Sequence, residues 1–168
     1  MVQQTLIIIK PDGVAGEFTD EIIRRYEAAG LKIVKRKDYE AAPLEIVEKH
    51  YPMESEYLKS IGEKTIAAGQ AVTSAEDQGR KVVTWLRKFI TSGPIVVMVL
   101  EGEDAVALAR KTTGFTDPST AESGTIRGDL GTDNILLANK EERPVYNLIH
   151  ASGSEEEAEK EIKLWFGD

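Results

Sequence analysis

Residues 95–100 form an uninterrupted apolar run, Ile-Val-Val-Met-Val-Leu, directly after the turn-forming sequence Ser92-Gly93-Pro94. A strand that is apolar on both faces is typical of the centre of a sheet that is covered on both sides. The run therefore predicts a central strand, and the rest of the chain must supply the neighbours and the cover of that strand.

Three other segments have the pattern of strands, and they alternate with helical patterns. Strands are expected at residues 5–9, which a Pro-Asp-Gly turn closes, at 31–34 and at 145–151. Helices are expected between the first two strands, over most of residues 43–91, at 105–112 and at 155–166. This order predicts an α/β (α+β) fold, a ferredoxin-like βαββαβ sandwich with right-handed crossovers. Its four-stranded antiparallel sheet should have helices on one face, plus the C-terminal helix.

Two stretches interrupt these patterns. Gly62, Gly69 and Gly79 break the helical pattern, and the polar residues 73–78 predict an exposed excursion. Residues 113–131 are rich in Thr, Gly, Asp and Ser and predict a long loop. Loops of that length without their own structure are usually functional or disordered.

Composition limits the possible chemistry. A length of 168 residues predicts one domain, residues 1–168. The absence of cysteine excludes disulfides, thiolate metal sites and cysteine nucleophiles, and it suits a reducing compartment. The net charge of −8 disfavours nucleic-acid binding, although a few basic side chains gathered in one cleft can still bind a small phosphorylated ligand.

The amino-terminal apolar run is too short to span a bilayer, and no small-residue cleavage site follows it. We therefore expect no membrane association and a cytoplasmic location.

His150 is the first candidate for a chemical role. A lone histidine at the end of a strand is often a hydrogen-bonded structural residue. Because side chains alternate along a strand, however, Ser152 should project to the same side as His150. A hydroxyl beside an imidazole indicates a functional site at His150.

Glu161 is the second candidate. It borders the apolar stripe of Ala158, Ile162 and Trp165 on the last helix, where a carboxylate is costly unless it is hydrogen-bonded. A bond to His150 would orient the imidazole and leave its other nitrogen free as a nucleophile. The neighbouring acidic residues keep a second explanation open, a solvated flank of an amphipathic helix.

Several motifs occur together in one order along nearly the whole chain. They are Lys10-Pro11-Asp12-Gly13-Val14, Gly124-Thr125-Ile126-Arg127-Gly128-Asp129, Asn147-Leu148-Ile149-His150-Ala151-Ser152, and the helix of residues 159–166. In this combination the chain resembles the nucleoside diphosphate kinases. Relative to that family it has extra segments around 60–80 and 132–146.

The resemblance implies catalytic roles for the matching residues. His150 would be the nucleophile that takes the phosphate, with Ser152 and Glu161 as its hydrogen-bonding supports. Lys10 would contact the transferred phosphate, and Tyr51, preceded by a histidine as in the family, would place its hydroxyl nearby. Considered alone, Lys10 is an edge lysine and Tyr51 a helix-face aromatic residue.

The resemblance also implies a nucleotide site. Arg110, Thr116 and Arg127 match the residues that hold the nucleotide phosphates, for which guanidinium groups offer fixed, paired donors, although Thr116 alone is also a plausible turn residue. Asn147 matches the residue that contacts the sugar. Asn147 and His150 have opposite parity on a regular strand, so the strand must begin later than residue 145 or contain a bulge if both face the ligand.

Some positions depart from the family pattern. Gly153 replaces an aspartate at the junction between strand and helix, and Ser123 replaces a proline in the long loop. Val82 occupies the place of the phenylalanine that stacks on the base, while Leu86 matches the second apolar residue of that platform. We therefore expect weaker base stacking.

The implied activity is transfer of the terminal phosphate from ATP or another nucleoside triphosphate to a nucleoside diphosphate, through a phosphohistidine. Mg²⁺ should arrive with the nucleotide phosphates, because the sequence contains no evident carboxylate cage for a metal ion. The partners would be nucleoside di- and triphosphates and further copies of the chain, in a hexamer or otherwise a tetramer.

Two other hypotheses remain. One is a catalytically impaired nucleotide-binding or interaction protein of the same fold, which the substitutions at Gly153 and Val82 motivate. The other is an unrelated phosphate-binding enzyme, but no GxxxxGK[S/T] loop is present.

Overall fold

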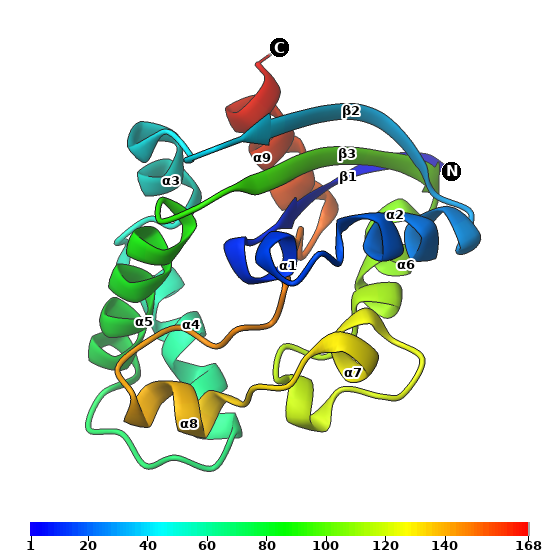
Figure 1. Ribbon diagram of the computed structural model, residues 1–168. Helices are drawn as coiled ribbons and strands as arrows, with labels where there is room; N and C mark the ends of the chain where they lie inside the picture. The colour runs from blue at the N-terminus through cyan, green and yellow to red at the C-terminus, as the bar shows by residue number, and fades with distance from the viewer. Residues whose placement is uncertain (168) are drawn as a thin grey trace.

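The computed structural model describes residues 1–167 and contains a four-stranded sheet with the order β2-β3-β1-β4 (Figure 1). The strands are β1 (Val2–Ile9), β2 (Lys32–Tyr39), β3 (Ile95–Glu103) and β4 (Ile149–Ala151). Every neighbouring pair is antiparallel. The apolar run that predicted a central strand lies in β3, between β2 and β1, so this prediction and the ferredoxin-like fold class are confirmed.

Helices connect the strands and extend the chain around the sheet. They are α1 (Pro11–Ala15), α2 (Thr19–Ala28), α3 (Leu44–His50), α4 (Ser55–Ala67), α5 (Ala75–Ile90), α6 (Ala105–Thr113), the 3₁₀ helix η1 (Pro118–Thr120), α7 (Ile126–Leu130), α8 (Ile135–Lys140) and α9 (Glu155–Phe166). In residues 1–167 no helix is both long enough and apolar enough to cross a bilayer.

The alternation of side chains along β1 divides the apolar core between the two faces of the sheet. Ile7 and Ile9 pack in a cluster that includes residues of α2 and α6, the two crossover helices. Leu6 and Ile8 pack in a second cluster with residues of α3, α5 and Trp165 of α9. The C-terminal helix thus covers the face opposite to the crossover helices, and α3 and α5 share that face with it.

Strand β4 is shorter than predicted. Leu148 has a left-handed backbone with φ of 72°, and the Asn147 N–H donates to the carbonyl of Val145, so that pairing begins only at Ile149. Asp12 stabilises this turn, because its Oδ2 accepts from the Leu148 N–H at 2.9 Å. The late start of β4 is one of the two arrangements that the parity of Asn147 and His150 required.

The glycines between residues 60 and 80 are points of close helix contact. A Cβ atom built on Gly62 would lie 1.8 Å from the Ala75 carbonyl oxygen, and one built on Gly79 would lie 1.7 Å from that of Leu58. Glycine therefore lets α4 and α5 form a tightly packed hairpin. The expectation of an exposed excursion at 73–78 was wrong for its end, because α5 begins at Ala75 and Gln78 is buried.

The predicted loop at 113–131 contains two short helices, η1 and α7. Asp117 Oδ1 accepts from the Ser119 N–H, and Thr125 Oγ1 accepts from the Gly128 N–H. Part of the turn-forming composition of this segment therefore serves to cap these helices.

Candidate active site

A cavity of about 790 Å³ lies between the helices α3 to α5 on one side and the segment from α6 to α7 on the other. Figure 1 shows the two groups of helices apart, with the segment from α8 to β4 running between them. The cavity brings together nearly all the residues that the sequence singled out: Lys10, Tyr51, Val82, Leu86, Arg110, Thr116, Arg127, Asn147, His150 and Glu161. Ser152 lies behind it and is fully buried.

His150 on β4 and Glu161 on α9 form a close pair. His150 Nε2 lies 3.0 Å from both carboxylate oxygens of Glu161. Ser152 Oγ donates to Glu161 Oε2 at 2.6 Å, so Ser152 supports His150 through the carboxylate and does not contact the ring by a hydrogen bond. Burial disfavours ionisation of Glu161, but the charge and hydrogen bond of His150 outweigh it and lower the pKa of Glu161 to about 2.

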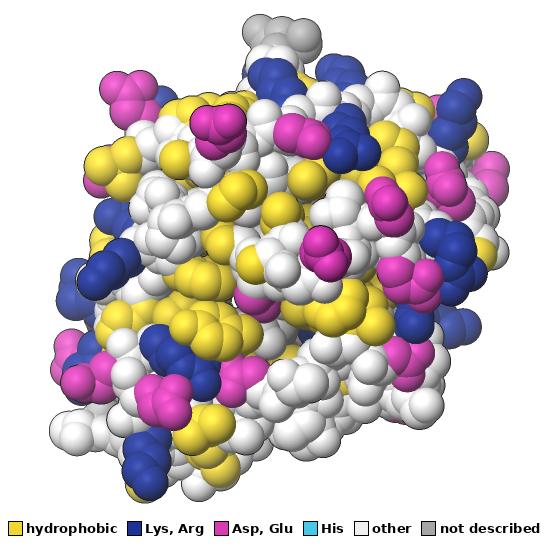
Figure 2. All heavy atoms as spheres, viewed as in Figure 1, with side chains coloured by type: hydrophobic (Ala, Val, Ile, Leu, Met, Phe, Trp, Pro, Cys, Tyr) yellow, Lys and Arg dark blue, Asp and Glu magenta, His cyan; other side chains and the backbone are white. Residues whose placement is uncertain are grey.

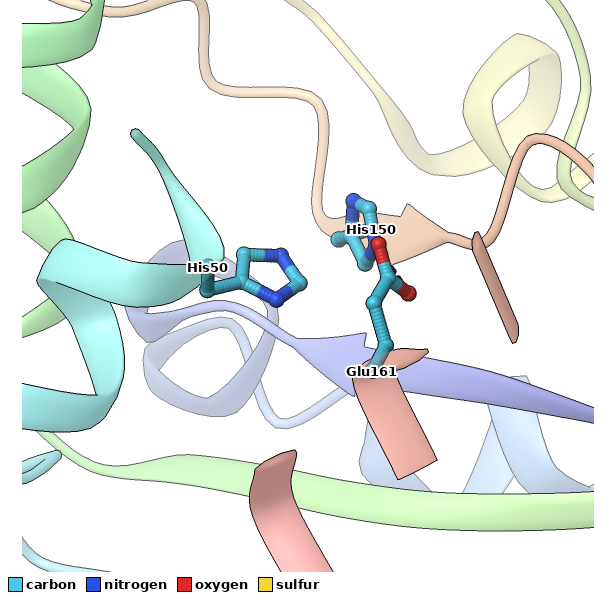
Figure 3. Close-up of side chains that lie close together, drawn as sticks. All are labelled: His50, His150 and Glu161. Carbon is cyan, nitrogen blue, oxygen red and sulfur yellow. Dashed lines mark hydrogen bonds and ion pairs between the residues drawn. The ribbon is translucent and has the colours of Figure 1, made fainter. Parts of the chain in front are cut away.

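This pairing fixes the tautomer of His150. An ionised carboxylate only accepts hydrogen bonds, so the proton of a neutral imidazole must be on Nε2 and the lone pair on Nδ1. Nδ1 makes no hydrogen bond to any other residue of the described chain, and Figure 3 shows the second ring nitrogen pointing away from Glu161. The arrangement therefore presents a nucleophilic nitrogen.

His50, at the end of α3, packs against His150 with ring centroids 4.5 Å apart and an interplanar angle of 83° (Figure 3). Trp165 Nε1 donates to His50 Nδ1 at 3.1 Å. Burial foremost, and then the nearby His150, lowers the pKa of His50 to about 3, so the ring is neutral. The sequence placed His50 only as the neighbour of Tyr51. Neither histidine is visible on the face shown in Figure 2.

His50, His150 and Glu161 could together hold a metal ion by composition, since one ligand atom from each lies within 4.8 Å of the others. The hydrogen bond from Trp165 argues against this use of His50. It occupies the lone pair of Nδ1, so the proton of the neutral ring is on Nε2 and no second lone pair is left for a metal.

Lys10 follows β1 and is almost completely buried, with 5% of its surface exposed. Its Nζ donates to Asn147 Oδ1 at 2.8 Å. Burial foremost, and then the positive charge of Arg127, lowers the pKa of Lys10 to about 7. A bound anion would counter both effects, so this lysine lies where a phosphate group would be favourable.

Asn147 joins three parts of the site. Besides accepting from Lys10, its Nδ2 donates to the backbone carbonyl of Thr116 at 2.9 Å. Its own backbone carbonyl accepts from Arg127 Nε at 3.0 Å. The side chain predicted to contact a sugar is thus also a brace between β1 and the loop that contains Thr116.

Arg127 is mainly engaged with backbone carbonyls. Besides Asn147, its guanidinium donates to the carbonyls of Gly114 and Ile149. A guanidinium has five N–H groups, so two of them remain without a hydrogen-bond partner in residues 1–167. Burial lowers the pKa of Arg127 to about 10. Arg110, by contrast, is exposed on α6 and lines the cavity.

Tyr51 is buried at the end of α3, and its ring centroid lies 6.4 Å from that of His150. Its hydroxyl has no hydrogen-bond partner among the described residues. Burial raises the pKa of Tyr51 well above its ordinary value, so the hydroxyl keeps its proton. A buried hydroxyl without a partner is costly, and its place in the cavity wall suits a polar ligand.

The far wall of the cavity is apolar. Val82 and Leu86 lie one turn apart on α5 and are partly buried. Tyr57 and Ile61 of α4 and Phe115 of the loop join them. No sequence motif includes these three residues, so they were not predicted to line the site.

Gly153 does not disturb the junction between β4 and α9. Its N–H donates to Glu157 Oε2 at 2.8 Å, while Ser154 Oγ accepts from the Glu157 N–H at 3.2 Å. The reciprocal bonds of a capping box are therefore formed, with the returning bond shifted by one residue to Gly153.

Comparisons with known proteins identify the family of the chain. A family model for nucleoside diphosphate kinase matches residues 3–65 and 73–168. The nucleoside diphosphate kinase of Pyrobaculum aerophilum is 49% identical over 175 residues, which cover 98% of this chain and 95% of that protein.

Two solved structures are also similar. A crystal structure of an NDP kinase from P. aerophilum has a TM-score of 0.91 and 45% identity, and the match covers 99% of this chain and 96% of that one. A transition-state mimic of nucleoside-diphosphate kinase from Borrelia burgdorferi, with bound vanadate and ADP, has a TM-score of 0.80 and 32% identity, with 99% and 88% covered. Because both sequence and structure match over almost their full lengths, the chain belongs to the nucleoside diphosphate kinase family.

Proposed function

We propose that His150 is the nucleophile through which this chain performs the reaction of its family, reversible transfer of a terminal phosphate between nucleotides. The observation that supports this role most directly is the pair of 3.0 Å contacts between His150 Nε2 and Glu161, which leave the Nδ1 lone pair available.

In the first step, the Nδ1 lone pair forms a bond to the terminal phosphorus of the donor triphosphate. The bond from that phosphorus to the bridging oxygen breaks, and the nucleoside diphosphate leaves with the electron pair. No proton has to leave Nδ1, and Glu161 stabilises the positive charge that develops on the ring. In the second step, a terminal oxygen of the acceptor diphosphate attacks the same phosphorus, and His150 is regenerated.

The other residues bind and orient the phosphates. Lys10 would contact the transferred phosphate, and the hydroxyl of Tyr51, which has no hydrogen-bond partner among residues 1–167, would donate to it. Arg110 and the two unused N–H groups of Arg127 supply donors for the remaining phosphates. Fixed donors of this kind stabilise charge spread over the phosphoryl oxygens in the transition state.

Around the proposed sugar and base, the contacts are fewer. Asn147, which precedes β4 and lines the cavity, would contact the sugar, whereas Thr116 of the loop would join the phosphate donors. Val82 and Leu86 offer only apolar surface to the base. Such contacts are similar for every base, so we propose weak selection among them.

Mg²⁺ fits this cavity as a companion of the nucleotide. The residues proposed for the phosphates, Lys10, Arg110 and Arg127, are cationic, and the carboxylate closest to His150, that of Glu161, is already hydrogen-bonded. The ion would be held by phosphate oxygens and water and would neutralise phosphate charge.

Phosphorylation without an acceptor tests the proposal. Incubation with ATP labelled on its terminal phosphate, in the presence of Mg²⁺, should label one histidine with an acid-labile, base-stable phosphate. His150→Ala should abolish the label, whereas His50→Gln should retain it. Addition of CDP should transfer the label to CTP. Label that persists in His150→Ala would show that another residue is the nucleophile, and binding of ADP without any labelling would favour the catalytically impaired alternative.

The proposal includes a closed homo-oligomer, a hexamer or otherwise a tetramer, and a cytoplasmic location. Symmetric closure is the common form of homo-oligomers. Light scattering at micromolar concentration tests the oligomeric state, and a monomer would contradict the proposal. Fractionation of the source cells tests the cytoplasmic location.

A further inference from the structure

The α4–α5 hairpin contributes one basic residue to the cavity. Tyr57, Ser60, Ile61 and Lys64 line the cavity and repeat at the spacing of one helix face. The family model matches residues 3–65 and so includes Lys64, but none of the motifs that carry the family resemblance contains this lysine. A cationic side chain thus enters the cavity from a position that these motifs do not assign.

The position of Lys64 is fixed by its surroundings. The neighbouring Thr65 is buried, and its Oγ1 accepts from Asn139 Nδ2 at 3.3 Å. Asn139 belongs to α8, and its Oδ1 in turn accepts from Gln78 Nε2 of α5 at 3.3 Å. This partly buried polar network links α4 to both α5 and α8, three helices that lie together at one end of the molecule in Figure 1.

The close contact of Gly62 with Ala75 further restricts rotation of α4 about its axis. The face that contains Lys64 is therefore held toward the cavity. A side chain placed by a rigid helix loses less freedom when it binds a ligand than one on a mobile loop.

The charges around Lys64 are mostly of the same sign. Desolvation of the ammonium group foremost, and then the positive charges of Arg127 and Arg110, lower the pKa of Lys64, although much of the residue's surface is exposed. The negative charge of Glu157 acts in the opposite direction. In the described part of the chain no carboxylate lies within ion-pair distance of its ammonium group. The positions one helical turn away, 60, 61, 67 and 68, hold Ser, Ile, Ala and Ala, so no ion pair within the helix explains this lysine either.

We propose that Lys64 binds the polyphosphate group of the nucleotide, together with Arg110 and Arg127. The inference rests on the proposed function for the identity of the ligand. A cluster of like charges in one cavity is unfavourable by itself and becomes favourable when an anion occupies the cavity. Because Lys10 is the lysine proposed for the transferred phosphate, Lys64 should bind the phosphates that are not transferred.

Binding measurements on Lys64→Met test this directly. Isothermal titration calorimetry with ADP, AMP and adenosine should show that the variant loses affinity relative to the wild type, and that this loss increases with the number of phosphates on the ligand. We expect the Kd for ADP to rise roughly tenfold, as for loss of one charge-assisted hydrogen bond, while the affinity for adenosine is unchanged. In steady-state kinetics the KM for ADP should rise and kcat should stay similar, since the contact is equal in ground and transition states.

Two further variants control the experiment. Lys59→Met removes an exposed lysine from the same helix that does not line the cavity, and it should bind ADP as the wild type does. Lys64→Arg should retain most of the affinity because it keeps the charge. Thermal unfolding followed by circular dichroism checks that each variant is folded, and Lys64→Gln replaces Lys64→Met if the latter is not.

An ADP affinity of Lys64→Met within twofold of the wild type would overturn the proposal, and so would an equal loss for adenosine. Failure of the proposed function is distinguishable, because calorimetry with ADP requires no phosphate transfer. Wild-type protein that binds ADP but is never phosphorylated on His150 would contradict the catalytic assignment and leave the Lys64 comparison valid.

Discussion

Replacement of Glu161 by glutamine isolates the effect of its charge on His150. The amide has nearly the same shape, and its oxygen can still accept from His150 Nε2 and from Ser152. Nδ1 should therefore keep its lone pair, and phosphorylation should still occur there. The positive charge that develops on the ring when Nδ1 attacks would, however, lose its carboxylate partner.

The size of the effect follows from the pKa of Glu161, which the site lowers from 4.5 to about 2. A difference of this size corresponds to about 3 kcal/mol, since each pKa unit is worth roughly 1.4 kcal/mol. A charge-assisted hydrogen bond contributes about 1.5 to 3 kcal/mol. Since only part of the charge has developed in the transition state, we expect a loss of about 2 to 3 kcal/mol, or roughly a 30- to 150-fold decrease in kcat/KM.

Rapid-quench measurement of histidine phosphorylation by ATP gives the rate of the first step alone. The rate of Glu161→Gln should fall by the stated factor, while its Kd for ADP stays within about threefold of the wild type. Ser152→Ala, which removes a donor to Glu161 but no charge, should lose less. A phosphorylation rate of Glu161→Gln within threefold of the wild type, with the fold intact by circular dichroism, would refute the role assigned to the carboxylate.

Three more substitutions follow from the geometry. Burial lowers the pKa of Lys10 from 10.5 to about 7. Between these two pH values only the unfolded chain keeps the proton, and below pH 7 the folded chain must hold a buried positive charge. Lys10 therefore destabilises the folded state most below pH 7. Lys10→Met should therefore abolish phosphorylation yet raise the free energy of unfolding by ~2 kcal/mol at pH 6. This difference from the wild type should shrink toward pH 10. A Tm of Lys10→Met below that of the wild type at pH 6 would contradict this reasoning. Val82→Phe should lower the KM for ADP, GDP, CDP and UDP alike, by roughly two- to twelvefold from ~0.5 to 1.5 kcal/mol of stacking. A spread in kcat/KM above about a thousandfold among them would instead indicate base-specific hydrogen bonds. Gly62→Ala places a methyl group 1.8 Å from the Ala75 carbonyl oxygen and should destabilise the protein by ~2 to 4 kcal/mol in urea unfolding, whereas Lys59→Ala should cost less than ~0.5 kcal/mol.

Local patterns predicted the layered fold and several individual features. The apolar run in β3 identified the centre of the sheet, because a strand covered on both faces cannot alternate. The helical pattern of residues 155–166 predicted α9, which Ser154 caps because its Oγ accepts from the Glu157 N–H. The position of Glu161 beside an apolar stripe predicted a hydrogen-bonded carboxylate, and the pairing with His150 and Ser152 agrees with that prediction.

Contacts between distant segments could not be predicted in the same way. Gly62 and Gly79 looked like helix breakers, because a local pattern does not contain the second helix that each one touches. The bond from Trp165 that sets the protonation of His50 joins residues 115 positions apart. Arg127 looked like a pure phosphate ligand, and only the folded chain reveals that three carbonyls already occupy part of its guanidinium.

The sequence by itself determined the order of the four strands and of the main helices, and it indicated His150, Ser152 and Glu161 as candidates for a chemical role. These properties depend on periodicity and on residue type, which are local. Tertiary structure decided where β4 begins, because Asp12 binds the Leu148 N–H across 136 positions and holds a left-handed turn. It also decided that Lys64 faces the cavity, since only packing of α4 against α5 and α8 orients that helix.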